Sequence, residues 1–95
     1  MAAYLIAQIE VTDQEAFDAY RAKVPATIAK YGGRYLVRGG AITTLEESPP
    51  KPRVIVLEFE SVAAARRWYE SPEYRPLIPM RRRAADGPVM IVEGA

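Results

Sequence analysis

The chain has 95 residues and a mass of 10.6 kDa, enough for one domain over residues 1–95 and too little for two. Hydrophobic residues make up 49% and charged residues 26%, a balance typical of a globular protein and not of a disordered or membrane-spanning chain. The chain has no Cys and no His, which excludes disulfides, Cys/His zinc sites and imidazole catalysis, and a net charge of +1 gives no overall attraction to nucleic acid.

The first half of the chain predicts a strand, a helix and a second strand. Residues 2–11 alternate between two sets of side chains, as a strand does. After the capping residues Thr12 and Asp13, apolar residues recur at helical spacing as far as Tyr31. Pro25 predicts a break or restart within this helix. We expect the second strand over residues 34–38, a bend at two glycines, and an extended continuation over 41–46.

The second half repeats the pattern after a proline-rich loop over residues 48–52. Residues 53–60 form the strongest predicted strand, and Ser61 caps a helix that ends near Glu70. Ser71 and Pro72 predict a fresh helical start, irregular because of further prolines, which extends to about residue 85. A turn at 86–87 then leads to a last strand over residues 88–93.

This order predicts an α+β fold of the ferredoxin-like βαββαβ kind, with a four-stranded antiparallel sheet in spatial order 4-1-3-2 and helices on one face. The face toward the helices is then apolar: Leu5, Ala7, Ile9, Ile55, Leu57 and Phe59. The opposite face is also rich in apolar residues: Tyr4, Ile6, Val54 and Val56, with Val89 and Ile91 or their neighbours Met90 and Val92. Because monomers seldom expose so large an apolar patch, we expect a second copy to cover it in a homodimer.

Several segments together resemble a bacterial family known as domain of unknown function 1330. The resemblance rests on the run YGGRYLVRGG at 31–40, the strand at 54–59, the run WYESPEY at 68–74, and Arg81. It covers nearly the whole chain and implies a dimeric α/β barrel, in which two ferredoxin-like sheets face each other. The wider superfamily includes cofactor-independent monooxygenases, muconolactone-isomerase-like enzymes and haem-dependent relatives. The absence of His departs from the haem-binding relatives.

Two arginines are candidate anion-binding residues. Arg38 leaves its strand where the backbone bends, near the mouth of any pocket between sheet and helices, and the family resemblance singles out Arg81. A guanidinium can bind a carboxylate through two parallel hydrogen bonds. For Arg38, a structural ion pair with a nearby Glu is an equally good interpretation. We expect Arg81 and Arg38 to face one pocket, and Arg82 and Arg83 to be solvated.

The candidate site also contains aromatic residues and one acid. Tyr20, Tyr35, Trp68 and Tyr74 are ligand contacts in this hypothesis, although aromatic residues at helical spacing more often only pack. Tyr74 lies beside a proline break and is the best placed to offer its hydroxyl in catalysis. Glu58, in a central strand, is the candidate general base if it is buried, and a rim residue otherwise.

The leading functional hypothesis is a cytoplasmic homodimer that binds a small carboxylate-bearing molecule, with isomerase, lyase or oxygenase chemistry that needs no cofactor or metal. The alternative is a homodimer without catalytic activity, whose cavity its own side chains fill. We expect no membrane partner, since no apolar run reaches the roughly 18 residues of a membrane helix and the start lacks a signal-peptide pattern. RNA binding is disfavoured because residues 53–60 offer Phe59 as their single aromatic residue.

Overall fold

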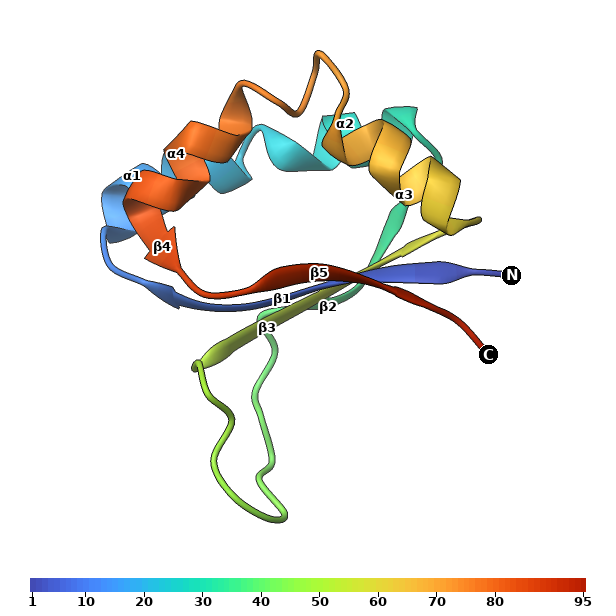
Figure 1. Ribbon diagram of the computed structural model, residues 1–95. Coiled ribbons are helices and arrows are strands. Elements are labelled where there is room, and N and C mark those ends of the chain that lie inside the picture. Colours follow the sequence, from blue (N-terminus) through green and yellow to red (C-terminus); the bar gives the residue numbers. More distant parts are fainter.

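A computed structural model describes residues 1–95 as one sheet with a layer of helices on one of its faces (Figure 1). The elements in chain order are β1 (Ala3–Val11), α1 (Gln14–Arg21), α2 (Val24–Lys30), β2 (Arg34–Arg38), β3 (Arg53–Phe59), α3 (Val62–Tyr69), α4 (Leu77–Ala84), β4 (Ala85–Asp86) and β5 (Val89–Glu93).

The sheet is antiparallel, and its four main strands lie in the order β2-β3-β1-β5, which confirms the ferredoxin-like prediction. The short β4 was not predicted from the sequence. It pairs with the last residues of β1, where Glu10 lies opposite Asp86 and Val11 opposite Ala85. Gly87 then returns the chain to β1 with φ of +140°, a backbone conformation that side chains rarely allow.

Helices α1 and α3 begin at the capping residues that the sequence predicts. The Asp13 side chain accepts a hydrogen bond from the Ala16 backbone N–H at 3.1 Å, and Ser61 Oγ caps α3 in the same way at 3.0 Å. The long predicted helix is two helices, α1 and α2, with Pro25 in the first turn of α2, where a missing N–H is tolerated.

The turn between α3 and α4 places Tyr74 in the core. Ser71 Oγ accepts the Tyr74 backbone N–H at 3.1 Å and donates to the Trp68 carbonyl at 2.7 Å. The fresh start predicted at Ser71 and Pro72 is therefore a hydrogen-bonded turn, and a regular helix forms only from Leu77 onward.

One predicted element is wrong. The extended continuation over residues 41–46 is no strand, because β2 ends at Arg38 and pairing with β3 stops there. Gly39, with φ of +71°, turns the chain away, and the prolines of the loop supply no donors for a ladder. Residues 40–52 instead form an arm that projects from the sheet on the side opposite the helices (Figure 1).

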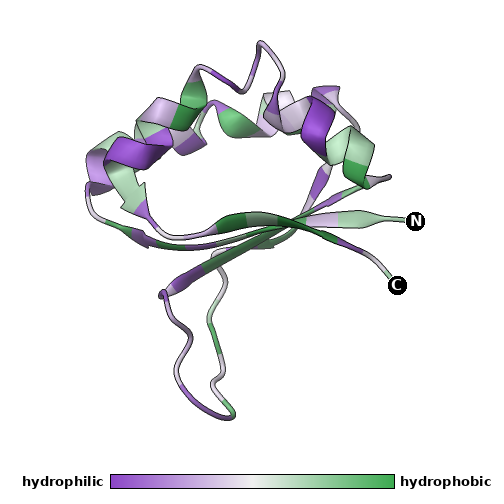
Figure 2. Cartoon of the chain, in the orientation of Figure 1, coloured by the Kyte–Doolittle hydropathy of each residue, from purple (hydrophilic) through white to green (hydrophobic).

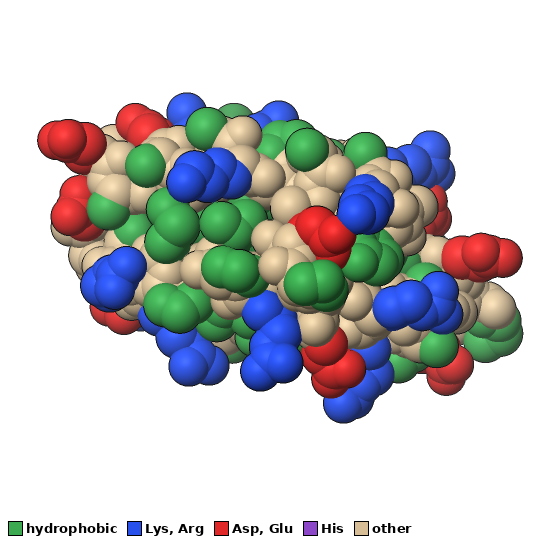
Figure 3. Space-filling view, turned by 90° about the horizontal axis from the view of Figure 1, so that it is seen from above, with side chains coloured by type: hydrophobic (Ala, Val, Ile, Leu, Met, Phe, Trp, Pro, Cys, Tyr) green, Lys and Arg blue, Asp and Glu red, His purple; other side chains and the backbone are tan.

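The two faces of the sheet differ in what covers them. On the helix side, Leu5, Ala7, Ile9, Leu57 and Phe59 are buried against the helices, and Figure 2 shows hydrophobic residues concentrated in these strands. On the helices' outer surface, charged side chains of both signs are interspersed with apolar ones (Figure 3).

No element covers the other sheet face (Figure 1). The pairing register brings Ile6 opposite both Val56 and Met90, and Tyr4 opposite Val92, so Met90 and Val92 are the β5 residues on this face. Met90 is 39% exposed and Val92 43% exposed. We call the apolar set Ile6, Val37, Val54, Val56, Met90 and Val92 the open sheet face.

Candidate functional site: an arginine-lined cavity between sheet and helices

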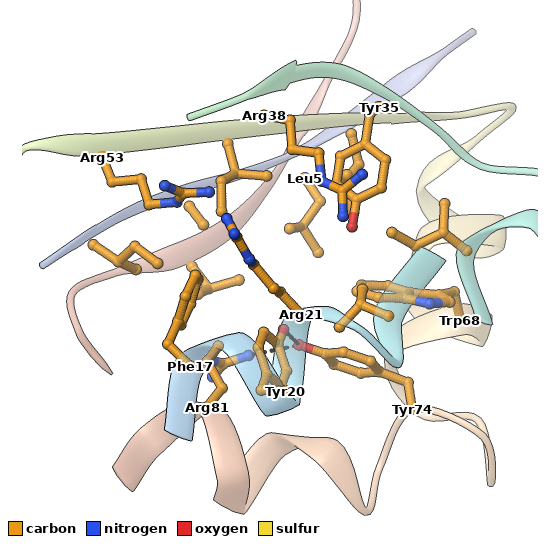
Figure 4. Close-up of a pocket in the computed structure, with 17 residues that line it drawn as sticks. Leu5, Phe17, Tyr20, Arg21, Tyr35, Arg38, Arg53, Trp68, Tyr74 and Arg81 are labelled. Atoms are coloured by element: carbon orange, nitrogen blue, oxygen red, sulfur yellow. Dashed lines mark hydrogen bonds between the residues drawn. The ribbon is translucent and has the colours of Figure 1, made fainter. Parts of the chain in front are cut away.

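A cavity lies between the helix side of the sheet and α1, α2, α3 and α4, and Figure 4 shows the residues that line it. Its volume is about 50 Å³. The cavity is therefore narrow. Its walls are mostly apolar and include the rings of Phe17, Tyr35 and Trp68.

Four arginines and no acidic residue line this cavity. Arg21 comes from α1, Arg38 from β2, Arg53 from β3 and Arg81 from α4. Arg21 and Arg38 are exposed, so their end of the cavity is its mouth, whereas Arg81 is half-buried. A narrow apolar cavity with several guanidinium groups and no carboxylate in its wall favours an anionic ligand.

At the far end of the cavity, Arg81 is hydrogen-bonded to Tyr74, which is in turn hydrogen-bonded to Tyr20. Its Nη1 donates to the Tyr74 hydroxyl at 3.0 Å, and the Tyr74 and Tyr20 hydroxyls share a buried hydrogen bond of 2.7 Å (Figure 4). Burial, and then the neighbouring Tyr74, raise the pKa of Tyr20 above its ordinary value, so this phenol stays protonated. Burial opposes the charge of Arg81, but the nearby tyrosines outweigh it and raise the pKa of Arg81.

Arg53 lies at the other end of the cavity, between Phe17 and the backbone of Gly39. Its Cζ is 5.3 Å from the Phe17 ring centre, and a Cβ added at Gly39 would lie 2.5 Å from that same Cζ. Its Nε is buried and has no hydrogen-bond partner. An unpartnered N–H of a charged group is costly to bury, so this nitrogen favours an acceptor supplied by a ligand or by solvent.

The remaining wall is aromatic. Arg38 stacks its guanidinium over the Tyr35 ring at 4.5 Å, and burial raises the pKa of Tyr35. Trp68 stacks on Tyr74 with ring centres 4.0 Å apart. Its only donor, Nε1, already donates to Thr27 Oγ1 at 2.9 Å, so Trp68 offers a ligand apolar contact and no hydrogen bond.

The structure thus brings six of the seven predicted site residues to one cavity: Arg38, Arg81, Tyr20, Tyr35, Trp68 and Tyr74. It does not bring Glu58 there. Glu58 lies on the opposite face of the sheet, where its carboxylate accepts a hydrogen bond from Arg34 Nε at 2.7 Å and forms an ion pair with Arg34 Nη2 at 2.6 Å. Glu58 is therefore outside the cavity in which it was the candidate general base, since its even position in β3 directs it away from the helices.

Arg21 and Arg53 are cavity residues that sequence reasoning missed. The position of Arg53 was readable, because Arg53, Ile55 and Leu57 alternate with residues of the open sheet face. Arg21 had a weaker signal, because it stands at the exposed end of α1, where it contacts Asp18 at 3.3 Å.

No group of three or more acidic side chains is close enough to hold a metal ion. No helix is long and apolar enough to cross a membrane.

Solved structures with the same fold include the following three. A protein of unknown function from Rhodopseudomonas palustris is 19% identical with a TM-score of 0.77, and the match covers 99% of this chain and 82% of that one. The cofactor-independent oxygenase SnoaB from Streptomyces nogalater is 16% identical with a TM-score of 0.63, over 99% and 93% of the two chains. HapK from Hahella chejuensis is 16% identical with a TM-score of 0.58, over 98% and 92%.

No curated protein matches the chain at a significant level. The family model of a domain of unknown function, DUF1330, matches residues 2–95. The chain belongs to the DUF1330 family.

Proposed function

We propose that the protein binds a small, largely apolar carboxylate in the cavity between sheet and helices. The observation that carries the proposal is the four arginines in a wall that contains no Asp or Glu. Guanidinium groups around one cavity repel one another, and a bound anion offsets that repulsion. Aromatic and aliphatic walls supply the affinity for the apolar part of the ligand.

The test is a matched pair of ligands, benzoate and benzamide, which differ in charge and hardly in shape. Isothermal titration calorimetry should show binding of benzoate about tenfold or more tighter than benzamide, because a charge-assisted hydrogen bond contributes about 1.5–3 kcal/mol. Equal affinity for the two, or binding of neither, overturns the proposal.

Arginine variants locate the binding. Arg38→Ala should weaken benzoate binding, while Arg83→Ala, which removes the same charge from an exposed part of α4 outside the cavity, should leave it unchanged. Loss of melting temperature in Arg38→Ala without a change in affinity would instead identify Arg38 as a structural residue.

The chemistry available in this cavity is proton transfer and oxyanion stabilisation. Tyr74 is the catalytic candidate, because its hydroxyl is polarised by the Arg81 guanidinium at 3.0 Å. We include turnover as an isomerase, lyase or oxygenase in the proposal, on the ground that a cofactor-independent oxygenase shares the fold. Incubation of saturating carboxylate ligands with the protein, followed by mass spectrometry, tests it, and unchanged ligands together with tight binding favour a binding protein without catalysis.

We further propose that the working form is a homodimer whose open sheet faces meet. An apolar face on β1, β3 and β5 with no helix over it supports a partner of matching shape, and a twofold copy supplies one. The arm over residues 40–52 projects on the same side and would flank the second copy.

A further inference from the structure

The polar groups of the cavity lie at two separate ends. One end has Tyr20, Tyr74 and Arg81, and the other has Arg53 with the exposed Arg38 and Arg21. Arg53 Cζ is 5.3 Å from the Phe17 ring centre, which in turn is 5.7 Å from the Tyr20 ring centre. Arg53 Cζ therefore lies at most about 11 Å from the Tyr20 ring centre, and aromatic rings border the space between the two ends.

At the buried end, one hydroxyl of the Tyr20–Tyr74 pair has an O–H donor without an acceptor. Tyr74 oxygen accepts from Arg81, and the two hydroxyls share one hydrogen bond, so one of the two O–H protons is used between them. The other O–H proton has no acceptor among the side chains or backbone of the chain, although Tyr20 is 8% and Tyr74 2% exposed. A buried hydroxyl donor without a partner is unfavourable, so this end is complementary to an oxygen acceptor on a ligand.

At the mouth, the placement of the Arg53 guanidinium favours binding of an anion. Its guanidinium is fixed between the Phe17 ring and the Gly39 backbone, and its buried Nε is unpartnered. Gly39 is needed for this placement, since any side chain there would displace the Arg53 head group, whereas a Cβ at Gly40 would meet nothing within 4 Å. A guanidinium that packing confines on two sides loses less entropy when it binds a carboxylate.

We propose that the ligand is a flat ring compound with oxygen functions at opposite ends. Its carboxylate binds Arg53 at the mouth. A phenolic, enolic or carbonyl oxygen at its other end accepts a hydrogen bond from the O–H group of the Tyr20–Tyr74 pair that has no partner within the protein. This inference rests on the proposed function and deepens it by assigning the orientation and the second functional group. Its chemical consequence is that the buried end stabilises the ionised form of a phenol or enol.

Three fluorinated probes test this with wild-type protein. The probe 3-fluoro-4-hydroxybenzoate has both functions, 3-fluorobenzoate lacks the hydroxyl, and 2-fluorophenol lacks the carboxylate. The ¹⁹F chemical shift reports the ionisation of the neighbouring hydroxyl, and the protein contains no fluorine. Bound 3-fluoro-4-hydroxybenzoate should ionise at least about one pH unit below the free probe, and it should bind more tightly than either partial probe.

Variants assign the two ends. Arg53→Ala should weaken binding of both benzoates about tenfold or more and leave 2-fluorophenol binding nearly unchanged. Tyr20→Phe combined with Tyr74→Phe, which keeps both rings and removes both hydroxyls, should abolish most of the shift in phenol ionisation, whereas either single change leaves one O–H donor and should keep part of the shift. Arg83→Ala should change neither quantity.

The outcomes separate this inference from the proposed function. If none of the three probes binds, both are overturned. If the benzoates bind but the phenol ionises as it does in free solution, or if Arg53→Ala binds benzoates normally, the two-ended ligand is overturned and the carboxylate-binding function stands.

Discussion

Glu73 fastens helix α2 to the turn that carries Tyr74. Its carboxylate accepts hydrogen bonds from Lys30 Nζ at 2.5 Å and from the Tyr31 hydroxyl at 2.6 Å. These contacts, Lys30 first, hold the pKa of Glu73 at about 2, below its usual 4.5. A carboxyl group with a lowered pKa stabilises the folded state at neutral pH and loses that contribution on protonation.

We therefore predict a pH-dependent effect of Glu73→Gln. The loss of melting temperature relative to wild type should be full above about pH 5 and should shrink as the pH falls toward 2, because the unfolded chain binds the proton first. Differential scanning calorimetry across this range measures it. Glu46→Gln, an exposed residue of the arm with no ion pair, is the control. A constant difference at every pH would contradict the role given to Glu73.

Thr27 holds Trp68, a residue of the cavity wall, in place through a hydrogen bond. Its hydroxyl accepts from Trp68 Nε1 at 2.9 Å and donates to the Val24 carbonyl at 2.7 Å. Thr27→Val keeps the shape but leaves the buried indole N–H unpaired, which should cost about 1–3 kcal/mol in urea unfolding. Thr27→Ser keeps both hydrogen bonds and loses only a methyl group, so the Ser variant should be the more stable of the two. Equal stability would mean that the hydrogen bonds contribute little.

For single residues, the sequence correctly predicted the direction of side chains that lie in regular helices and strands. Alternation along β3 and helical spacing along α1 correctly indicated which aromatic side chains turn inward. Three consecutive arginines on α4 differ as their 100° spacing predicts, with Arg81 half-buried and its two neighbours exposed. The hydrogen bond between Tyr20 and Tyr74 was beyond reach, because it joins residues 54 positions apart through a turn whose geometry only the folded chain defines.

At the scale of elements, Gly87 decides how β4 and β5 meet β1. Its φ is +140°, and a Cβ added there would lie 1.9 Å from the Gln8 carbonyl oxygen. We predict that Gly87→Ala destabilises the protein by about 3 kcal/mol or more, because neither the backbone conformation nor the contact can be kept. Gly40→Ala, where a Cβ meets nothing within 4 Å, is the matched control. Chemical denaturation of the two variants compares them, and similar midpoints would show that the strands adjust freely.

The elements that sequence reasoning misjudged are those without a periodic pattern. Residues 41–46 are compatible with a strand in composition, yet no strand is available to pair with them once Gly39 has turned the chain away. β4 has only two residues, too few for any alternation, and it exists because Gly87 brings Ala85 and Asp86 beside β1. Regular repeats predict elements, whereas pairing partners depend on the whole fold.

At the scale of the molecule, the two faces of the sheet have different surroundings. The helix side builds the cavity, while the side bearing Ile6, Val56 and Met90 has no cover of its own. A chain this small buries only about 60–65% of the surface that its unfolded form exposes, so covering a second apolar face adds to a marginal stability. The proposed homodimer thus also supports the cavity, because β1 and β3 contribute side chains to both faces.

The corresponding prediction concerns Val56 at the centre of the open sheet face. Light scattering at micromolar concentration should give about twice 10.6 kDa for the wild type. Val56→Asp should give the monomer mass or an unfolded chain, since an unpaired charge in a sheet interface costs several kcal/mol. Ala63→Asp, on the exposed side of α3, should remain a dimer. A wild-type monomer, or a Val56→Asp variant that keeps the mass and stability of the wild type, would show that the open sheet face does not mediate pairing.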